Sequence, residues 1–235
     1  MCGRFSLTTA PEAMRQLFEF ENFLNLAPRY NIAPTQMVSC IRADEAGKRQ
    51  LEFLRWGLIP SWSKDAAMGA KLINARAETV AEKPSFRDAF ANRRCLIAAD
   101  GFYEWRQEEG HKQPFRIGMK GGLPFAFAGL WERWTAVADG AGIAAGETVE
   151  TVTIVTTTAN GKLRPIHARM PVILPYEAYA PWLDAANDRD GLLSLLGPYP
   201  VEPLAFYRVG SAVSNARNDG PECIAPVKSA AASGG

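Results

Sequence analysis

Hydrophobic residues in this chain gather in short β-branched or aromatic runs that are bounded by glycine and proline, a pattern typical of β-strands. Two such runs, at residues 36–42 and 51–56, are joined by a polar turn at 44–47 and predict a hairpin. From residue 95 onward the pattern is mostly strand-like, and we expect strands at residues 95–99, 115–119, 125–131, 151–157, 171–174 and 204–209.

Helical periodicity is confined to short segments. Near the start of the chain, Thr9 and Glu12 form a capping-box pattern around an early proline, and Met14, Leu17 and Phe18 then supply an apolar stripe. Further helices are predicted at residues 83–92, 177–185 and 191–196.

The strands come in runs and do not alternate with helices. This order indicates an α+β protein, with a single domain built on a curled, largely antiparallel β-sheet or barrel and flanking helices. We expect the domain to span residues 1–226 and the small-residue segment 227–235 to form a disordered tail. The Gly/Ala-rich segment 136–147 is predicted to be a mobile hairpin tip.

Composition excludes several classes of protein. The chain has 235 residues, of which 47% are hydrophobic and 22% charged, with a net charge of +1. That is ordinary globular composition, and the bulk charge does not indicate a nucleic-acid binder. The basic residues are 18 arginines and 8 lysines, however, and arginine is the better bidentate phosphate ligand. A local basic groove is therefore compatible with the sequence.

Cysteine and histidine usage argues against a metal site. The four cysteines are scattered without a CxxC motif, and the chain has two histidines. We therefore expect no metal and no cofactor. The first 25 residues lack a signal-peptide core and no transmembrane span is apparent, so we expect a cytoplasmic protein that is not attached to a membrane.

The residue with the most distinctive chemistry is Cys2. Removal of Met1, which is usual before a small residue, leaves a thiol and an α-amine on adjacent carbons. The amine condenses with an aldehyde to an imine, and the thiol closes onto the imine carbon to form a thiazolidine ring. The amine titrates near ~8 and the thiol near ~8.5, so both have a reactive fraction at neutral pH. The alternative is a small buried hydrophobic residue.

Two further side chains are candidates for proton transfer. Glu104 lies between Tyr103 and Trp105 after an apolar run, and such surroundings raise the pKa of a carboxyl group towards neutrality. The alternative is an outward-facing strand glutamate. His167 lies between two prolines and titrates near neutral pH; the alternative is a hydrogen-bonded structural histidine. His111, in a polar turn, is expected to be solvent-exposed.

Seven segments together resemble the SOS-response-associated peptidase (SRAP) family. They are residues 2–5 (CGRF), 29–34 (RYNIAP), 55–60 (RWGLIP), 73–79 (INARAET), 100–105 (DGFYEW), 166–171 (IHARMP) and 213–215 (VSN). They occur in register from residue 2 onward, and the resemblance extends to about residue 226. Seven motifs in register are highly specific, whereas no single one decides the assignment.

The resemblance implies covalent capture of abasic sites in single-stranded DNA. Cys2 would be the nucleophile after self-processing at Met1, and Asn74 would hold its amine or the open sugar. Glu104 would orient the amine and move protons, and His167 would act as acid and base on the deoxyribose. The resemblance thus implies a thiol-dependent enzyme of peptidase or lyase type.

The resemblance also implies a DNA channel. Pro34 and Trp62 would border it as apolar wedges, and Thr156 fits a site position. Phosphates would be held by arginines that each lie within two residues of a candidate catalytic group, namely Arg4, Arg76 and Arg169. Some family members have two adjacent tryptophans where this chain has Trp62-Ser63.

Two other functions remain open from the sequence. One is a cysteine peptidase that acts on separate proteins; the other is a non-covalent reader of modified or single-stranded DNA. The implied partners are single-stranded DNA with abasic sites and replication-fork proteins. We expect a monomer, associated with the nucleoid if the protein is bacterial.

Overall fold

Five strands close into a barrel at the centre of the molecule. A computed structural model describes residues 2–22 and 24–227 of the chain. The barrel strands are β3 (Met37–Ala43), β4 (Arg49–Trp56), β6 (Arg94–Ala99), β9 (Phe125–Thr135) and β10 (Thr148–Thr158). Strand β4 pairs with β3, β3 with β6, β6 with β9 and β9 with β10, all antiparallel. A parallel pairing of β10 with β4 closes the ring.

Three short strands extend the barrel wall. Strands β5 (Asn74–Arg76) and β11 (Arg169–Pro171) both pair with the C-terminal part of β10, and β12 (Ile173–Leu174) pairs with β9. One end of β10 therefore lies between two segments that are about ninety residues apart in the chain.

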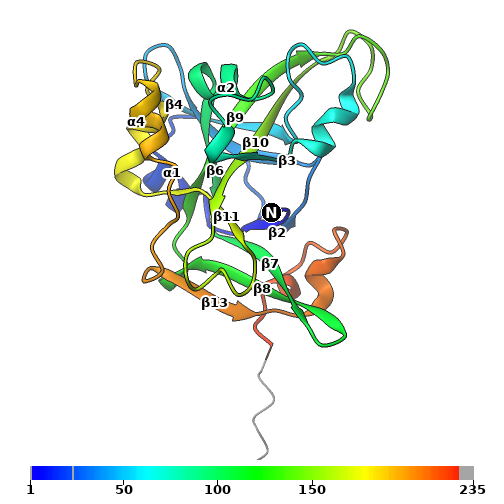
Figure 1. The fold of residues 1–235 in the computed structure, drawn as a ribbon, viewed down its shortest axis with the longest axis vertical. Coiled ribbons are helices and arrows are strands. Elements are labelled where there is room, and N and C mark those ends of the chain that lie inside the picture. Colours follow the sequence, from blue (N-terminus) through cyan, green and yellow to red (C-terminus); the bar gives the residue numbers. More distant parts are fainter. Residues whose placement is uncertain (1, 23, 228–235) are drawn as a thin grey trace, which may run out of the picture.

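A second, antiparallel sheet lies below the barrel in Figure 1. Its strands, in spatial order, are β13 (Leu204–Arg208), β8 (His111–Met119), β7 (Gly101–Glu108), β1 (Phe5–Leu7) and β2 (Arg29–Ile32). The ring of Phe5 lies 5.2 Å from Trp56 and 5.7 Å from Phe127, both on barrel strands. These aromatic contacts join the two sheets into one core.

The helices are short and flank the barrel (Figure 1). They are α1 (Pro11–Phe18), α2 (Arg87–Asn92), α3 (Tyr179–Leu183) and α4 (Arg189–Ser194). The apolar stripe predicted for α1 is confirmed, because Met14 and Phe18 are fully buried. The architecture confirms the predicted α+β class with a curled, largely antiparallel sheet and flanking helices.

The predicted capping box is wrong. Ala10 is the N-cap of α1 and has no side-chain cap. The Thr9 hydroxyl instead donates to Asp100 at 3.3 Å. The Asp100 carboxylate also accepts hydrogen bonds from Ser6 and Thr8. The Asp100 carboxylate thus holds β1 and the segment that leads to α1 by hydrogen bonds.

The hairpin tip at residues 136–147 does join β9 to β10, as predicted. It is anchored near its middle: Ile143 is buried in a small cluster with Ile59 and Trp134, and Arg55 donates to the Ala141 carbonyl at 2.9 Å. In the predicted C-terminal tail, the Val227 N–H donates to the Arg208 carbonyl at 3.0 Å, and residues 228–235 lie outside the described residues.

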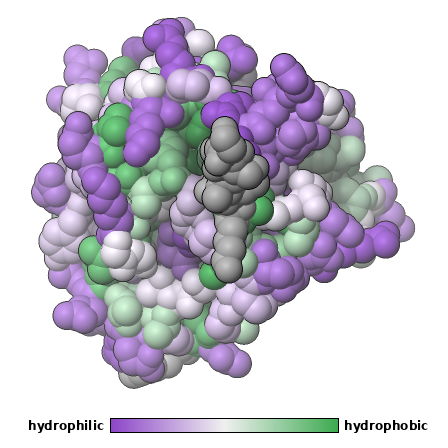
Figure 2. Space-filling model, turned by 90° about the horizontal axis from the view of Figure 1, so that it is seen from below, coloured by the Kyte–Doolittle hydropathy of each residue, from purple (hydrophilic) through white to green (hydrophobic). Residues whose placement is uncertain are grey.

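Surface character adds two findings. The face seen from below carries apolar residues in small groups among polar ones (Figure 2). Within residues 2–22 and 24–227, no helix combines the length and the apolar character needed to cross a membrane.

Candidate active site around Cys2

Cys2 lies between the barrel and the five-stranded sheet. Strand β1 pairs with β7 in the register Phe5 to Phe102, and the Tyr103 N–H donates to the Arg4 carbonyl at 3.0 Å. Continued towards the start of the chain, this register places Gly3 opposite Glu104, and the charge of Glu104 acts on the neighbouring Cys2 thiol. Figure 1 shows the blue start of the chain in this position. Cys2 is fully buried.

Asn74 reaches Cys2 from the barrel side. Strand β5 runs parallel to β10 and aligns Asn74 with Ile154. The Asn74 side-chain amide donates to the Cys2 carbonyl at 2.9 Å. Its Oδ1 is buried and has no hydrogen-bond partner among the residues that the structure describes. Asn74 therefore fixes the Cys2 backbone and keeps one acceptor for a further donor.

Glu104 points inward from β7 and is 3% exposed. The interpretation of Glu104 as an outward-facing strand residue is therefore wrong. Its Oε1 lies 3.8 Å from Nδ1 of His167. Burial raises the pKa of Glu104 to about 7. A carboxyl group with this pKa can both accept and donate a proton at neutral pH.

His167 lies in the turn before β11. Its Nδ1 lies 3.0 Å from both the backbone nitrogen and the carbonyl oxygen of Arg169, and the tautomer that donates from Nδ1 to this carbonyl leaves Nε2 free to accept a proton. Burial lowers the pKa of His167, which favours the neutral ring. The side chain is 31% exposed, so a substrate can reach it.

The Cys2 thiol is held in its protonated form. Burial raises its pKa well above the ordinary value, and the nearby charge of Glu104 raises it further. The thiol therefore needs a base before it can react. Glu104 and His167 are the bases that the structure places in this region.

The three arginines predicted to hold phosphates differ in their surroundings. Arg4 donates inward, to Asn31 Oδ1 at 2.8 Å and to the Val213 carbonyl at 2.7 Å. Arg169 forms a two-fold ion pair with Glu78. Arg76 is exposed. Among the three, Arg76 is the cation most open to solvent.

The remaining predicted residues are dispersed. Thr156 is fully buried on β10, with its hydroxyl 3.3 Å from the Ala75 carbonyl. Trp62 is 55% exposed, with its Nε1 3.4 Å from the Pro84 carbonyl. Pro34 is half-buried after β2. The described contacts unite Cys2 with Asn74, Glu104 with His167 and Thr156 with Arg169, but they do not include Pro34 or Trp62.

The serine after Trp62 has a structural role. Ser63 is 5% exposed, and its carbonyl accepts a hydrogen bond from the Trp134 indole at 2.7 Å. Its hydroxyl bonds within the turn, to the Asp65 carbonyl at 3.0 Å. A second tryptophan at position 63 would not fit this packing, so Trp62 alone is presented to solvent at this point.

Comparison with known proteins identifies the family. A family model described as SOS response associated peptidase (SRAP) matches residues 1–216. The chain belongs to the SRAP family. A relative from Bacillus subtilis, abasic site processing protein YoqW, is 44% identical over 95% of this chain and 99% of its own length. Abasic site processing protein HMCES from Pongo abelii is 32% identical over 97% of this chain and 76% of its own.

The fold is likewise that of a solved structure. A protein from Bacteroides thetaiotaomicron superposes on this SRAP chain with a TM-score of 0.85 at 26% identity. The match covers 96% of this chain and all of that one.

Two polar residues of the SRAP motifs have partners that the sequence did not reveal. Asn31 is buried, and its amide donates to the carbonyls of Val213, Asn215 and Asn218, which ties the C-terminal segment to β2. Glu78 pairs with Arg169. A polar residue between apolar neighbours was the one available signal for Asn31; Glu78 follows Ala77 on a short 3-10 turn and gave none.

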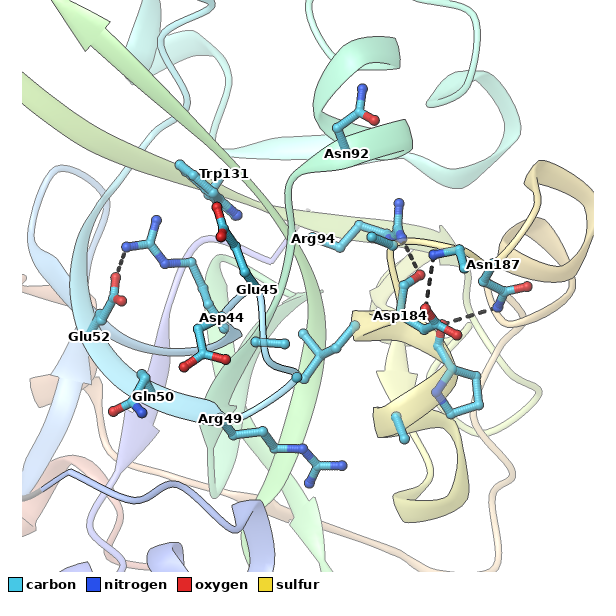
Figure 3. A pocket seen from close by; sticks show the side chains of 18 of the residues that line it. Asp44, Glu45, Arg49, Gln50, Glu52, Asn92, Arg94, Trp131, Asp184 and Asn187 are labelled. Carbon is cyan, nitrogen blue, oxygen red and sulfur yellow. Dashed lines mark hydrogen bonds and ion pairs between the residues drawn. The ribbon is translucent and has the colours of Figure 1, made fainter.

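A cavity of about 1180 Å³ lies elsewhere on the SRAP fold, between the β3–β4 hairpin and the segment from α3 to α4 (Figure 3). Its charged groups largely satisfy one another: Arg42 pairs with Glu52 and Glu150, and the Arg94 guanidinium donates to backbone carbonyls. None of the candidate site residues lines it. The cavity is therefore separate from the Cys2 site.

Metal ligation is not supported by the side-chain arrangement. Within the described part of the chain, no group of three or more His, Cys, Asp or Glu side chains is placed to hold a metal ion. The four cysteines are all free thiols and buried.

Proposed function

We propose that this SRAP protein captures abasic sites in single-stranded DNA as a covalent adduct on Cys2. The observation that carries the proposal is the convergence of Cys2, Asn74, Glu104 and His167, which come from four distant parts of the chain. The names of the relatives, abasic site processing proteins, support the same lesion as substrate.

The chemistry requires both functional groups of an N-terminal Cys2. We propose that Met1 is removed, which frees the α-amine. An abasic site equilibrates between a closed hemiacetal and an open aldehyde. The amine adds to the aldehyde carbon and one water leaves, giving an imine. The thiol then adds to the imine carbon and its proton passes to the nitrogen, giving a thiazolidine with the net loss of one water.

The surrounding side chains have the protonation states that these steps need. Neutral His167 accepts the hydroxyl proton of the hemiacetal and opens the ring. Glu104, with a pKa of about 7, takes a proton from the amine or the thiol and returns it to the departing hydroxyl. The unpartnered Oδ1 of Asn74 accepts a hydrogen bond from the freed amine.

Single-strand binding rests on groups around this centre. We propose that Arg76 contacts phosphates from its exposed position, with Arg4 and Arg169 closer to the lesion, and that Trp62 and Pro34 border the strand. An exposed tryptophan can stack on a base without regard to sequence.

A peptidase acting on separate proteins is not favoured. A cysteine peptidase that acts on separate proteins needs an accessible activated thiolate for its first step, whereas the Cys2 thiol is fully buried and its pKa is raised. In the proposed adduct the α-amine reacts first, and the thiol then attacks a carbon that is already bonded to the same residue. The peptidase activity that we propose is limited to removal of Met1.

The deciding experiment uses untagged protein and a single-stranded oligonucleotide with one abasic site. On a denaturing gel we expect a slow band, with the intact mass of protein without Met1 plus DNA minus one water. Cys2→Ala should give no such band, whereas Cys223→Ala, which alters another buried thiol, should retain it. Absence of the band with protein whose Met1 has been removed would refute the proposal.

A further inference from the structure

An ion pair links the two segments that carry Asn74 and His167. Glu78 follows β5, four residues after Asn74, and Arg169 begins β11, two residues after His167. The guanidinium of Arg169 donates to both carboxylate oxygens of Glu78, at 2.8 and 3.0 Å. Such a planar, two-point pair fixes orientation as well as distance.

The same guanidinium is also tied to the strand between these segments. Arg169 Nη2 donates to the Thr156 carbonyl at 2.5 Å and lies 3.3 Å from its hydroxyl. The Arg169 side chain is only 16% exposed. Glu78, β10 and β11 are thus joined through one side chain.

The anchoring of Arg169 extends to the imidazole. Nδ1 of His167 lies 3.0 Å from both the backbone nitrogen and the carbonyl oxygen of Arg169, and these contacts restrain the direction of the ring. Because the His167 side chain is 31% exposed, packing alone restrains it weakly. The position of the Arg169 backbone therefore matters for where Nε2 points.

We infer that Glu78 is a positioning residue, which holds Arg169 as a clamp and thereby sets the orientation of His167 in the site. The inference rests on the proposed function of His167 in opening the abasic sugar. It gives Glu78 a role in rate that is separate from the phosphate contact proposed for Arg76.

Stability is not the main effect of this pair. Glu78 is 47% exposed, and ion pairs of such exposure contribute little to folding. General acid–base catalysis, by contrast, typically accelerates a reaction about 100- to 10,000-fold, and a misdirected base loses much of this acceleration. A loss of rate without a matching loss of folded protein is therefore the signature of the clamp.

The test measures single-turnover adduct formation by full-length protein with its mature N-terminus, from pH 5.5 to 8.5. Glu78→Gln keeps the shape of the side chain and removes its charge. We expect the rate at pH 7 to fall about tenfold, as a fraction of the general acid–base advantage, while affinity for an intact single strand is not reduced. The uncompensated charge of Arg169 should also move the His167 limb of the pH profile to lower pH.

The charged groups that face His167 within the described chain are Glu104 from β7 and Arg169 from β11. Because Glu104 is unchanged in Glu78→Gln, its limb of the pH profile should stay in place. A shift of both limbs together would point to general unfolding of the site and would overturn the inference.

A second variant tests the clamp itself. Arg169→Lys keeps the positive charge but cannot form the two-point pair. It should reduce the rate as Glu78→Gln does, and the double variant should be no slower than the slower single variant, because both act through one unit. Multiplicative losses would show two independent roles and contradict the clamp.

The matched control is Glu82→Gln, which removes a charge four residues away. Glu82 is exposed and lies 3.6 Å from Arg189, so its rate should equal that of the wild type. If wild-type protein forms the adduct but Glu78→Gln has the wild-type rate and pH profile, the clamp is refuted while the proposed function stands. If wild-type protein forms no adduct, the proposed function itself fails.

Discussion

Burial determines the chemistry of the individual residues in this site. Glu104, at 3% exposure, has a pKa raised to about 7, and the Cys2 thiol is kept protonated by the same cause. The pKa of His167, which is partly exposed, is lowered by burial, so its ring stays neutral. The site thus combines a neutral imidazole, a carboxyl group that is about half-ionised at neutral pH and a buried, protonated thiol.

The raised pKa of Glu104 predicts how stability depends on pH. In the unfolded chain this carboxyl group titrates near ~4.3, whereas in the folded protein it titrates at about 7. The folded state therefore binds the extra proton, and the Glu104 contribution to stability falls as pH rises between these two values. Glu104→Gln should raise the free energy of unfolding at pH 8, by up to about 4 kcal/mol, and have little effect at pH 4.

Urea denaturation of both proteins at the two pH values measures this difference. Glu109→Gln serves as control, because Glu109 lies in the exposed turn between β7 and β8. An equal effect of Glu104→Gln at pH 4 and pH 8 would show that Glu104 is not buried as a proton-binding group.

Sequence context was sufficient for some site residues and not for others. Aromatic neighbours marked Glu104 as a desolvated carboxyl group, and position 2 marked Cys2, because both signals are local. The contact of Cys2 with Asn74 on β5 spans 72 residues, and the pair of Arg169 with Glu78 spans 91. No local pattern encodes such contacts, and Asn74 was assigned through the family resemblance alone.

At the scale of elements, β10 is the strand that assembles the site. It carries β5 on its parallel side and β11 on its antiparallel side, and so brings Asn74 and His167 to the same end of the barrel. The other half of the site depends on how firmly β1 is held against β7. Besides the backbone pairing of the two strands, the buried carboxylate of Asp100 contributes to this attachment through Ser6 and Thr8.

Asp100→Asn tests this attachment. Asp100 is 3% exposed, accepts from Ser6 Oγ at 2.7 Å and forms an ion pair with Arg116 at 2.9 Å. Loss of its charge leaves Arg116 buried without a counterion, and we expect a loss of about 3 kcal/mol of stability. Adduct formation should slow even where the protein is fully folded, because β1 positions Cys2.

Thermal unfolding and single-turnover kinetics measure the two effects separately. Asp65→Asn, at the N-cap of an exposed 3-10 helix, is the control and should change neither by a comparable amount. Wild-type kinetics in fully folded Asp100→Asn would contradict a role of this carboxylate in placing Cys2.

Prediction of the elements succeeded where the apolar pattern was continuous. The predicted ends of the barrel strands lie within a few residues of the observed ends. These strands could be located because they contain long runs of buried side chains. Two helices were predicted too long: α2 begins at Arg87 after a turn, and α3 ends at Leu183. Strands β1, β2 and β5 were missed, because three or four residues are too few to show a period. Strand β7 was also missed, because its first four residues are all buried and no alternation marks it in the sequence.

The net charge of the whole molecule is +1, so attraction of DNA phosphates must come from individual cations at the binding surface. Each phosphate neutralised by a cation contributes about −0.7 to the slope of log affinity against log salt for single strands. We expect Arg76→Ala to weaken binding of an intact single strand and to reduce the magnitude of this slope by about 0.7.

Fluorescence anisotropy between 50 and 300 mM salt, concentrations chosen as roughly spanning the screening range, measures the slope. Arg133→Ala is the matched control, because Arg133 is 68% exposed and pairs with Glu150 beside the remote cavity. If Arg76→Ala and the wild type have the same slope, Arg76 does not contact a phosphate.

The contact between Arg4 and the Val213 carbonyl joins positions 209 residues apart. During synthesis on a ribosome, Arg4 emerges long before Val213. The anchor beside Cys2 therefore cannot form until the segment around Val213 has been made. A product terminated before Val213 would lack this anchor, and its Cys2 would be held less firmly.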